Sequence, residues 1–217
     1  MTAEECPLPY LTVRAWTMRV PVFIVVSRIA FASGETVDVS RPLQVLGCNP
    51  MTADNVKELL QLEPLRMEGG FFRETYRSRW MIPPDYLPEG MRGMHSIATA
   101  IYFMITPESY SRLHRVPGSE IFHFYLGDPV VMLQLHPDGM HQTLTIGTDL
   151  ESGARPQVIV RGNTWMGCKL APGGKFALLG TTMSPGFAQS DYQGGVREEL
   201  IAQYPDAADM IQEYTRE

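Results

Sequence analysis

The stretch SYSRLHRVPGSEIFHFYLGDP, residues 109–129, decides how the chain is expected to fold. Two runs of strand-forming residues, 110–116 and 120–126, stand on either side of a Pro-Gly turn, which is typical of two short β-strands. Because side chains alternate along a regular strand, Glu120 and His123 should point to opposite faces of the sheet. The stretch therefore predicts β-structure and separates two residues that could otherwise act together.

The same pattern continues on both sides of this stretch. From Gly69 onward, turns rich in Gly, Pro and Asp-Gly recur at about ten-residue intervals. Candidate strands cover residues 70–79, 96–105, 110–116, 120–126, 129–136, 140–147, 157–160, 165–170 and 175–183. Apolar residues at helical spacing predict a short helix over 53–61 and a helical tail from Val196 to Ile211. We expect an all-β sandwich or jelly roll with a short helix before it and a helical C-terminal tail.

Composition excludes several classes of protein. With 217 residues, 44% hydrophobic and 19% charged, the chain has ordinary globular composition. We expect one domain over 51–217, preceded by an extension, 1–50, of uncertain structure. A net charge of −6 and the lack of a long Lys or Arg run argue against nucleic acid as a partner. Three widely spaced cysteines indicate neither a disulfide framework nor a zinc site, so a cytoplasmic location is expected.

One segment of the extension is strongly apolar. Its uninterrupted part, residues 20–26, is far shorter than the roughly 20 residues that a membrane-spanning helix needs. Its β-branched composition over 22–29 predicts a strand. We therefore expect no membrane association.

Four motifs resemble a known family. EGGFFRETYRS (68–78), TAIYFMI (99–105), HRVPGSEIFHFYLGDP (114–129) and PGFAQSDY (185–192) are similar to a cupin-like group of unknown function, which is recognised by an EGG-[YF]-F-R-E-T-Y motif. The resemblance implies a double-stranded β-helix, the cupin jelly-roll barrel, with a small-molecule cavity between its two sheets, and a homodimer. Where the family has His-Pro before the motif, this chain has Arg66-Met67. This chain therefore lacks that histidine but keeps Glu68.

The resemblance also bears on metal binding. Metal-binding cupins, a wider group, carry two histidines one residue apart, a glutamate, a glycine seven positions later and a further histidine. Glu120 keeps its spacing to the glycine and His114 lies near the second histidine, but Arg112 replaces the first histidine and Trp165 the last. Because two of four ligands are missing and an arginine opposes a cation, we expect no metal and no other cofactor.

Without a metal, the same residues suggest a polar site for a small molecule. Arg112, His114 and Glu120 are expected to point into one patch. His114 and Glu120 would form a catalytic proton-transfer pair, since an imidazole beside a carboxylate is a poised base, and Arg112 would hold an anionic ligand. The expected ligand-binding residues are Arg112, Phe122, Phe124, Trp165, Glu68 and Arg73, with Tyr102 and Tyr125 as candidate acids.

Three functions remain open from the residues. The first is a metal-independent isomerase or epimerase acting on a small carbonyl or sugar-type metabolite. The second is a non-catalytic metabolite-binding module, and the third, against which the missing ligands count, is a metal-dependent cupin oxygenase or isomerase. The substrate cannot be named from the sequence.

Several polar residues also have a purely structural interpretation. His114 and Glu120 could be a hydrogen-bonded pair that holds the turn between their strands. Arg73 and Glu74 could form structural ion pairs. His95, His136 and His141 are expected to be exposed turn residues, because they flank predicted strands.

Overall fold

The computed structural model describes residues 28–30, 36–38 and 51–215. The chain divides into two units, Met1–Asn49 and Pro50–Glu217. In the first unit, strands β1 (Arg28–Ala30) and β2 (Thr36–Asp38) pair antiparallel. The strand predicted over 22–29 overlaps β1 at its end, and the rest of that prediction lies outside the described residues.

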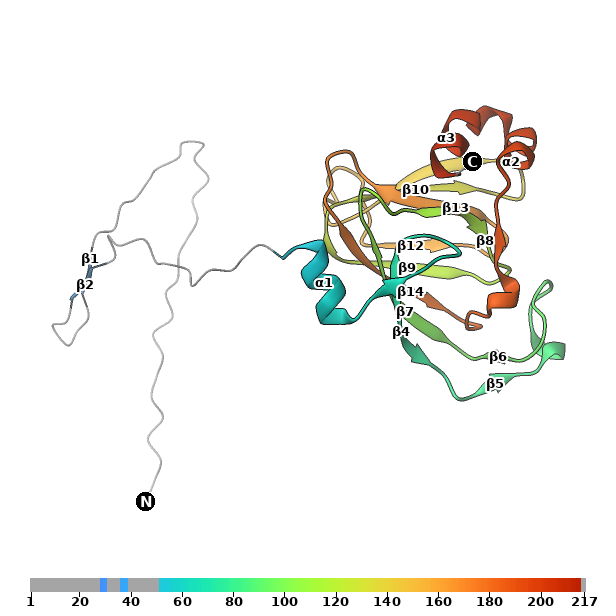
Figure 1. The fold of residues 1–217 in the computed structure, drawn as a ribbon, viewed down its shortest axis with the longest axis horizontal. Helices are drawn as coiled ribbons and strands as arrows, with labels where there is room; N and C mark the ends of the chain where they lie inside the picture. The colour runs from blue at the N-terminus through green and yellow to red at the C-terminus, as the bar shows by residue number, and fades with distance from the viewer. Residues whose placement is uncertain (1–27, 31–35, 39–50, 216–217) are drawn as a thin grey trace, which may run out of the picture. The chain divides into compact units, whose positions relative to one another are not determined.

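The second unit is built on two antiparallel sheets that lie face to face (Figure 1). The six-stranded sheet has the order β12-β9-β14-β7-β4-β3 and the five-stranded sheet the order β11-β10-β13-β8-β15. Their strands are β3 (Glu63–Pro64), β4 (Phe71–Arg77), β7 (Thr99–Ile105), β8 (Ser111–Arg115), β9 (Glu120–Gly127), β10 (Val130–Leu135), β11 (His141–Ile146), β12 (Gln157–Val160), β13 (Trp165–Leu170), β14 (Ala177–Met183) and β15 (Gln193–Gly194). Every strand predicted in the 51–217 domain is present, and the all-β prediction is confirmed.

Short elements complete the domain. The predicted first helix is α1 (Ala53–Leu60), whose N-terminus is capped by Thr52 in a capping box with Asn55. The predicted tail contains α2 (Arg197–Gln203) and α3 (Ala208–Tyr214). A small sheet of β5 (Met81–Ile82) and β6 (His95–Ser96) and the 3₁₀ helices η1 (Pro84–Tyr86), η2 (Gln189–Asp191) and η3 (Pro205–Ala207) lie in the connections.

The main core lies between the two sheets. It contains inward-facing residues of both, namely Phe103, Ile105, Phe122, Val130, Met132, Ile146, Val158, Val160, Met166, Cys168, Ala177 and Leu179. Alternation along the strands explains this set, since Met166 and Cys168 of β13 face inward, whereas Trp165 faces outward. Burial of these side chains is the main source of stability for the domain.

Helices pack on part of the outer face of each sheet. Helix α1 packs its buried Val56 against Met104 and Phe176 of the six-stranded side. On the five-stranded side, α2 and α3 cover Leu133 and Trp165 (Figure 1). The C-terminal tail thus contributes buried side chains to a hydrophobic cluster of the domain.

A β-bulge in β8 breaks the expected alternation. Met166 lies opposite His114 and Cys168 lies opposite Ser111, so two residues of β8 face one residue of β13 between them. Directly opposed residues share a face of the sheet, and Met166 and Cys168 both point into the core. Ser111 and His114 therefore both point inward, although a regular strand would place them on opposite faces.

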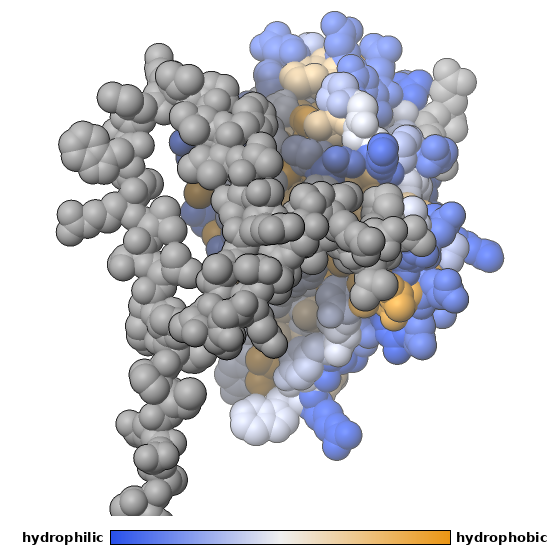
Figure 2. Space-filling view, turned by 90° about the vertical axis from the view of Figure 1, so that its left-hand side faces the viewer, coloured by the Kyte–Doolittle hydropathy of each residue, from blue (hydrophilic) through white to orange (hydrophobic). Residues whose placement is uncertain are grey.

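The surface of the domain is mixed. Hydrophilic residues cover much of the view in Figure 2 where grey atoms do not hide it, with hydrophobic residues among them. No helix within the described ranges is both long and apolar enough to cross a membrane.

Packing of the C-terminal helices can be tested at Ile211, which is fully buried on α3. Ile211→Ala should lower the free energy of unfolding by about 3 kcal/mol, because it removes buried methylene groups and leaves a cavity. Its neighbour Gln212 is exposed, so Gln212→Ala is a matched control that should change stability by less than about 0.5 kcal/mol. Chemical denaturation measures both changes, and equally small losses would contradict this packing.

Candidate active site

A cavity of about 380 Å³ lies between β8 and the six-stranded sheet. This volume is at the small end of the range for small-molecule sites. Its apolar lining consists of Leu65, Met67, Phe72, Met81, Met94, Ile101, Val116, Met183, Phe187 and Ala188. Its polar lining consists of Glu68, Glu74, Arg77, His95, Ser96, Thr99, His114, Glu120, Thr181 and Gln189.

His114 is held in a defined orientation at the inner end of the cavity. Its side chain is almost fully buried, and its Nδ1 lies 2.8 Å from the carbonyl oxygen of Arg112. Since a carbonyl only accepts hydrogen bonds, Nδ1 carries a proton and donates it. The Tyr192 ring stacks on the imidazole with a centroid distance of 5.2 Å. His114 Nε2 is therefore the nitrogen that is available for chemistry.

Two carboxylates face this nitrogen. Glu68 Oε2 lies 3.8 Å and Glu120 Oε2 lies 4.0 Å from His114 Nε2. Both distances exceed a hydrogen bond, so the imidazole is close to two carboxyl groups without being hydrogen-bonded to either. Burial alone lowers the pKa of His114, but the charges of Glu68 and Glu120 and the hydrogen bond to Arg112 outweigh it. The net pKa is raised above its ordinary value.

Glu120 is a buried carboxyl group with an unused oxygen. The residue is 7% exposed, and Oε2 has no hydrogen-bond partner. Burial raises the pKa of Glu120 to about 7, because the nearby imidazole of His114, which lowers it, does not compensate for desolvation and for the Glu68 charge. Glu120 therefore changes its protonation state close to neutral pH, which is the property required of a general base.

Glu68 is positioned by the backbone around it. Its Oε1 accepts a 2.7 Å hydrogen bond from Ser111 Oγ, and this bond depends on the bulge in β8. The next residue, Gly69, has φ +110°, and a Cβ atom there would clash with the carbonyl oxygen of Tyr110. Gly70 has φ +74°, and a Cβ atom would lie 2.8 Å from the Met104 carbonyl oxygen. Only glycine suits these two positions.

Arg112 lies outside the cavity lining, contrary to the sequence-based expectation. Its Nη2 donates to the carbonyl oxygens of Arg66 and Met67, both at 2.8 Å, and its Nε donates to that of Glu68 at 3.2 Å. The bulge explains the difference, because it removes Arg112 from the face that carries His114. Arg112 thus fixes the segment that carries Glu68 instead of facing a ligand.

Trp165 and Arg73 also lie away from the cavity. Trp165 packs among the C-terminal helices, with the Arg115 guanidinium 4.5 Å from its ring centroid. Strand alternation gives the reason, since its neighbour Met166 is the inward residue. Arg73 is exposed and donates a hydrogen bond to the Gln61 side chain.

The aromatic residues of β9 follow the predicted alternation, but they pack in the hydrophobic core. Phe122 and Phe124 face inward on the same side as Glu120 and pack in the main core without lining the cavity. His123 faces the other side, where its Nε2 lies 3.4 Å from Thr182 Oγ1. The predicted separation of Glu120 from His123 is confirmed. The candidate acid Tyr125 packs edge to face on Tyr102, and neither lines the cavity.

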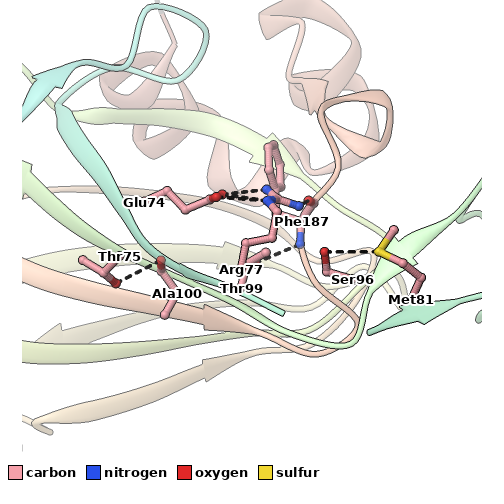
Figure 3. A network of polar contacts seen from close by, with 8 residues as sticks. All are labelled: Glu74, Thr75, Arg77, Met81, Ser96, Thr99, Ala100 and Phe187. Atoms are coloured by element: carbon pink, nitrogen blue, oxygen red, sulfur yellow. Dashed lines mark hydrogen bonds and ion pairs between the residues drawn. The ribbon is translucent and has the colours of Figure 1, made fainter. Parts of the chain in front are cut away.

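An ion pair lies at the rim of the cavity (Figure 3). Glu74 Oε2 accepts a 2.6 Å hydrogen bond from Arg77 Nη2, and Arg77 Nη1 donates to the carbonyl oxygen of Phe187 at 3.1 Å. A bulge at Thr75 in β4 brings Glu74 and Arg77 to the same side. Both side chains are about two-fifths exposed. The sequence predicted structural ion pairs for Arg73 and Glu74, and the structure pairs Glu74 with Arg77.

The sequence interpretation missed His95, which was expected to be exposed. His95 is 1% exposed and lines the cavity, and its Nε2 lies 2.7 Å from Asp191 Oδ2. This contact ties β6 to η2. The signal that could have revealed it is the PGFAQSDY motif, which contains both Asp191 and Tyr192 and has no obvious role in a strand.

The donor groups of the cavity are spaced more widely than a tetrahedral zinc site requires. Three donors about 2.1 Å from one tetrahedral Zn²⁺ lie roughly 3.4 Å apart, whereas His114 Nε2 is 3.8 Å and 4.0 Å from the two carboxylate oxygens. Across the described residues 28–30, 36–38 and 51–215, no group of three or more His, Cys, Asp or Glu side chains could hold one. No step proposed below uses a metal.

Comparisons with known proteins identify the family. Residues 54–194 match the family described as Cupin superfamily (DUF985). A crystal structure of a protein from Shewanella oneidensis shares 31% sequence identity, covers 76% of this chain and 98% of its own, and superposes with a TM-score of 0.68. A hypothetical protein from Leishmania major shares 27% identity, with coverage of 77% and 100% and a TM-score of 0.70. No curated protein matches. The chain belongs to the DUF985 family of the cupin superfamily.

Proposed function

We propose that the cavity is a metal-independent proton-transfer site, which isomerises or epimerises a small carbonyl compound. The observation that carries this proposal is the unpartnered, buried Oε2 of Glu120, whose carboxyl group has a pKa of about 7 and lies 4.0 Å from His114 Nε2. A base with a pKa near the working pH beside a protonated imidazole is suited to enolisation. The fold alone supports no particular reaction.

The proposed step uses these two groups in concert. Glu120 Oε2 removes the proton from the carbon next to the carbonyl group, while protonated His114 donates its Nε2 proton to the carbonyl oxygen. The product is an enol, and return of a proton to the opposite face of the same carbon gives the epimer. Where that carbon carries a hydroxyl group the product is an enediol, and protonation of the former carbonyl carbon, with loss of the proton from that hydroxyl, gives the isomer. Two protons are exchanged and no electrons are gained or lost, so no redox cofactor is required.

Glu68 has a supporting role in this proposal. Its charge raises the pKa of His114 and so favours the protonated imidazole that the proposed step uses. Ser111 and Gly69 hold it in place. Tyr192 stays a phenol, because burial and Glu68 raise its pKa to about 12, and its hydroxyl donates to the carbonyl oxygen of Met67.

The first testable prediction of this proposal concerns the pKa of His114. In Glu68→Gln, the pKa of His114 should fall relative to the parent, because a carboxylate that raises it has been removed. NMR titration of the imidazole resonances measures this directly. Exposed Glu151→Gln is the matched control and should leave the titration unchanged. A His114 pKa that does not respond to Glu68→Gln would contradict the proposed coupling.

The reaction should have a bell-shaped dependence on pH. The assay uses NMR to monitor exchange of the α-hydrogen of 3-hydroxy-2-butanone with D₂O. A chelator is present so that free metal ions do not contribute. The rate should fall as the pH drops below about 7, where Glu120 becomes protonated, and fall again above the raised pKa of His114, where the imidazole loses its proton. The pKa values that the two sides of this pH profile report belong to the coupled pair of Glu120 and His114, and not to either residue alone. A rate that increases steadily from pH 5 to 9, or that is abolished by the chelator, would argue against the mechanism.

Glu120→Gln separates catalysis from binding. It keeps the shape of the side chain but removes the base, so α-hydrogen exchange should fall by roughly 10²- to 10⁴-fold. Thermal stabilisation by the carbonyl compound should persist, and exposed Glu89→Gln serves as the control. If the parent binds carbonyl compounds but exchanges no α-hydrogen above background, the alternative of a non-catalytic binding module replaces the enzyme proposal.

A further inference from the structure

The cavity lining combines acid–base groups with apolar side chains. Its acid–base end holds Glu68, His114 and Glu120. Seven of the other lining residues are polar and ten are apolar, and four of these ten are methionines, namely Met67, Met81, Met94 and Met183. Methionine adapts its flexible thioether chain to apolar groups of irregular shape. The apolar part of the lining is therefore suited to hydrocarbon and poorly suited to a polyol, whose hydroxyl groups would lose their hydrogen bonds to water.

The charges of the cavity disfavour an anionic ligand. Of the described residues that line it, Arg77 alone is an arginine or lysine. Its Nε and Nη2 donate to Glu74, and its Nη1 donates to the Phe187 carbonyl oxygen. The guanidinium charge is thus already neutralised. A phosphate or carboxylate group would instead approach Glu68 and Glu120, which would repel it.

The acid–base end also holds an acceptor that enolisation does not use. If Glu120 Oε2 accepts the carbon-bound proton, Glu68 Oε2 remains, since Ser111 occupies Oε1 of Glu68. Glu68 Oε2 is 3.8 Å from His114 Nε2, which is too far for a hydrogen bond. A hydroxyl group on the substrate, next to the carbonyl that faces His114, would be a suitable donor to this oxygen.

From these contacts we infer the substrate class, an inference that rests on the proposed function of the same site. The substrate is an uncharged α-hydroxy ketone or aldehyde with an alkyl or aryl remainder. Its carbonyl oxygen faces His114 Nε2, its hydroxyl donates to Glu68, and its hydrocarbon lies against the methionines. Phosphorylated sugars and nucleotide sugars fall outside this class.

Three related probes test the inference on the full chain. 2-Hydroxyacetophenone has the aryl remainder, dihydroxyacetone replaces it by a hydroxymethyl group, and dihydroxyacetone phosphate adds charge. Binding is measured by calorimetry and thermal shift, and α-hydrogen exchange by NMR in D₂O. The aryl compound should bind more than about tenfold tighter than dihydroxyacetone, because it buries apolar surface against the methionines of the lining. The phosphate should bind more weakly than either.

A charge variant tests why anions are excluded. Glu74→Gln removes the ion-pair partner of Arg77, so affinity for dihydroxyacetone phosphate should increase by about tenfold while that for 2-hydroxyacetophenone changes little. Glu151→Gln, a surface carboxylate distant in sequence and outside the cavity lining, should change neither. If Glu74→Gln leaves phosphate binding as weak as in the parent, the ion pair is not what excludes anions, and this part of the inference is wrong.

The outcomes distinguish failure of the inference from failure of the proposed function. Tight binding of 2-hydroxyacetophenone without α-hydrogen exchange would support the ligand class and overturn the catalytic proposal. Exchange that is faster for dihydroxyacetone or its phosphate would support the catalytic proposal and overturn the ligand class. Tight binding with exchange that Glu120→Gln abolishes would support both.

Discussion

The bulge in β8 turns Ser111 and His114 to the same face of the sheet and removes Arg112 from that face. Contacts made by this segment of β8 then fix parts of the candidate site. Ser111 hydrogen-bonds Glu68, the Arg112 side chain holds the three carbonyl groups of residues 66–68, and the Arg112 carbonyl orients the His114 ring. A regular strand could not provide all of these contacts, because alternation would send one of the inward pair outward. One extra residue in a strand therefore assembles the acid–base end of the cavity.

This arrangement has a cost in stability that the rest of the domain must offset. A buried polar oxygen without a hydrogen-bond partner typically costs about 1–3 kcal/mol, and Glu120 Oε2 is such an oxygen. The core between the sheets and the apolar layers under α1 and under α2 and α3 supply the compensating burial. The domain thus combines three separate apolar clusters with one small polar cluster. This is the distribution expected where a functional site is held by a rigid scaffold.

The sequence predicted the fold well because the fold follows from local patterns. Alternation along 120–126 correctly separated Glu120 from His123, and helical spacing located α1 and the C-terminal helices. The candidate site was predicted only in part. His114, Glu120 and Glu68 line the cavity as expected, but the placement of Arg112 was wrong, since a bulge has no clear signature in a run of alternating residues.

Two further differences come from long-range packing. Trp165 was assigned to the cavity from motif spacing, yet the inward and outward faces of β13 are set by its neighbours in the sheet. His95 was expected to be exposed, because nothing near it in the sequence indicates that Asp191 would bury it. Contacts between residues almost a hundred positions apart are not visible in periodicity or turn signals. They require the folded structure.

Gly69 and Gly70 have a consequence for how such a site could change over time. Any side chain at either position would meet the backbone of Tyr110 or Met104, so the segment carrying Glu68 cannot be rebuilt by single substitutions without disturbing two strands. The methionines of the cavity lining carry no comparable restriction, because swaps among apolar side chains of similar volume are well tolerated. Evolution could therefore retune which molecule this cavity accepts while the chemistry performed on it stays the same.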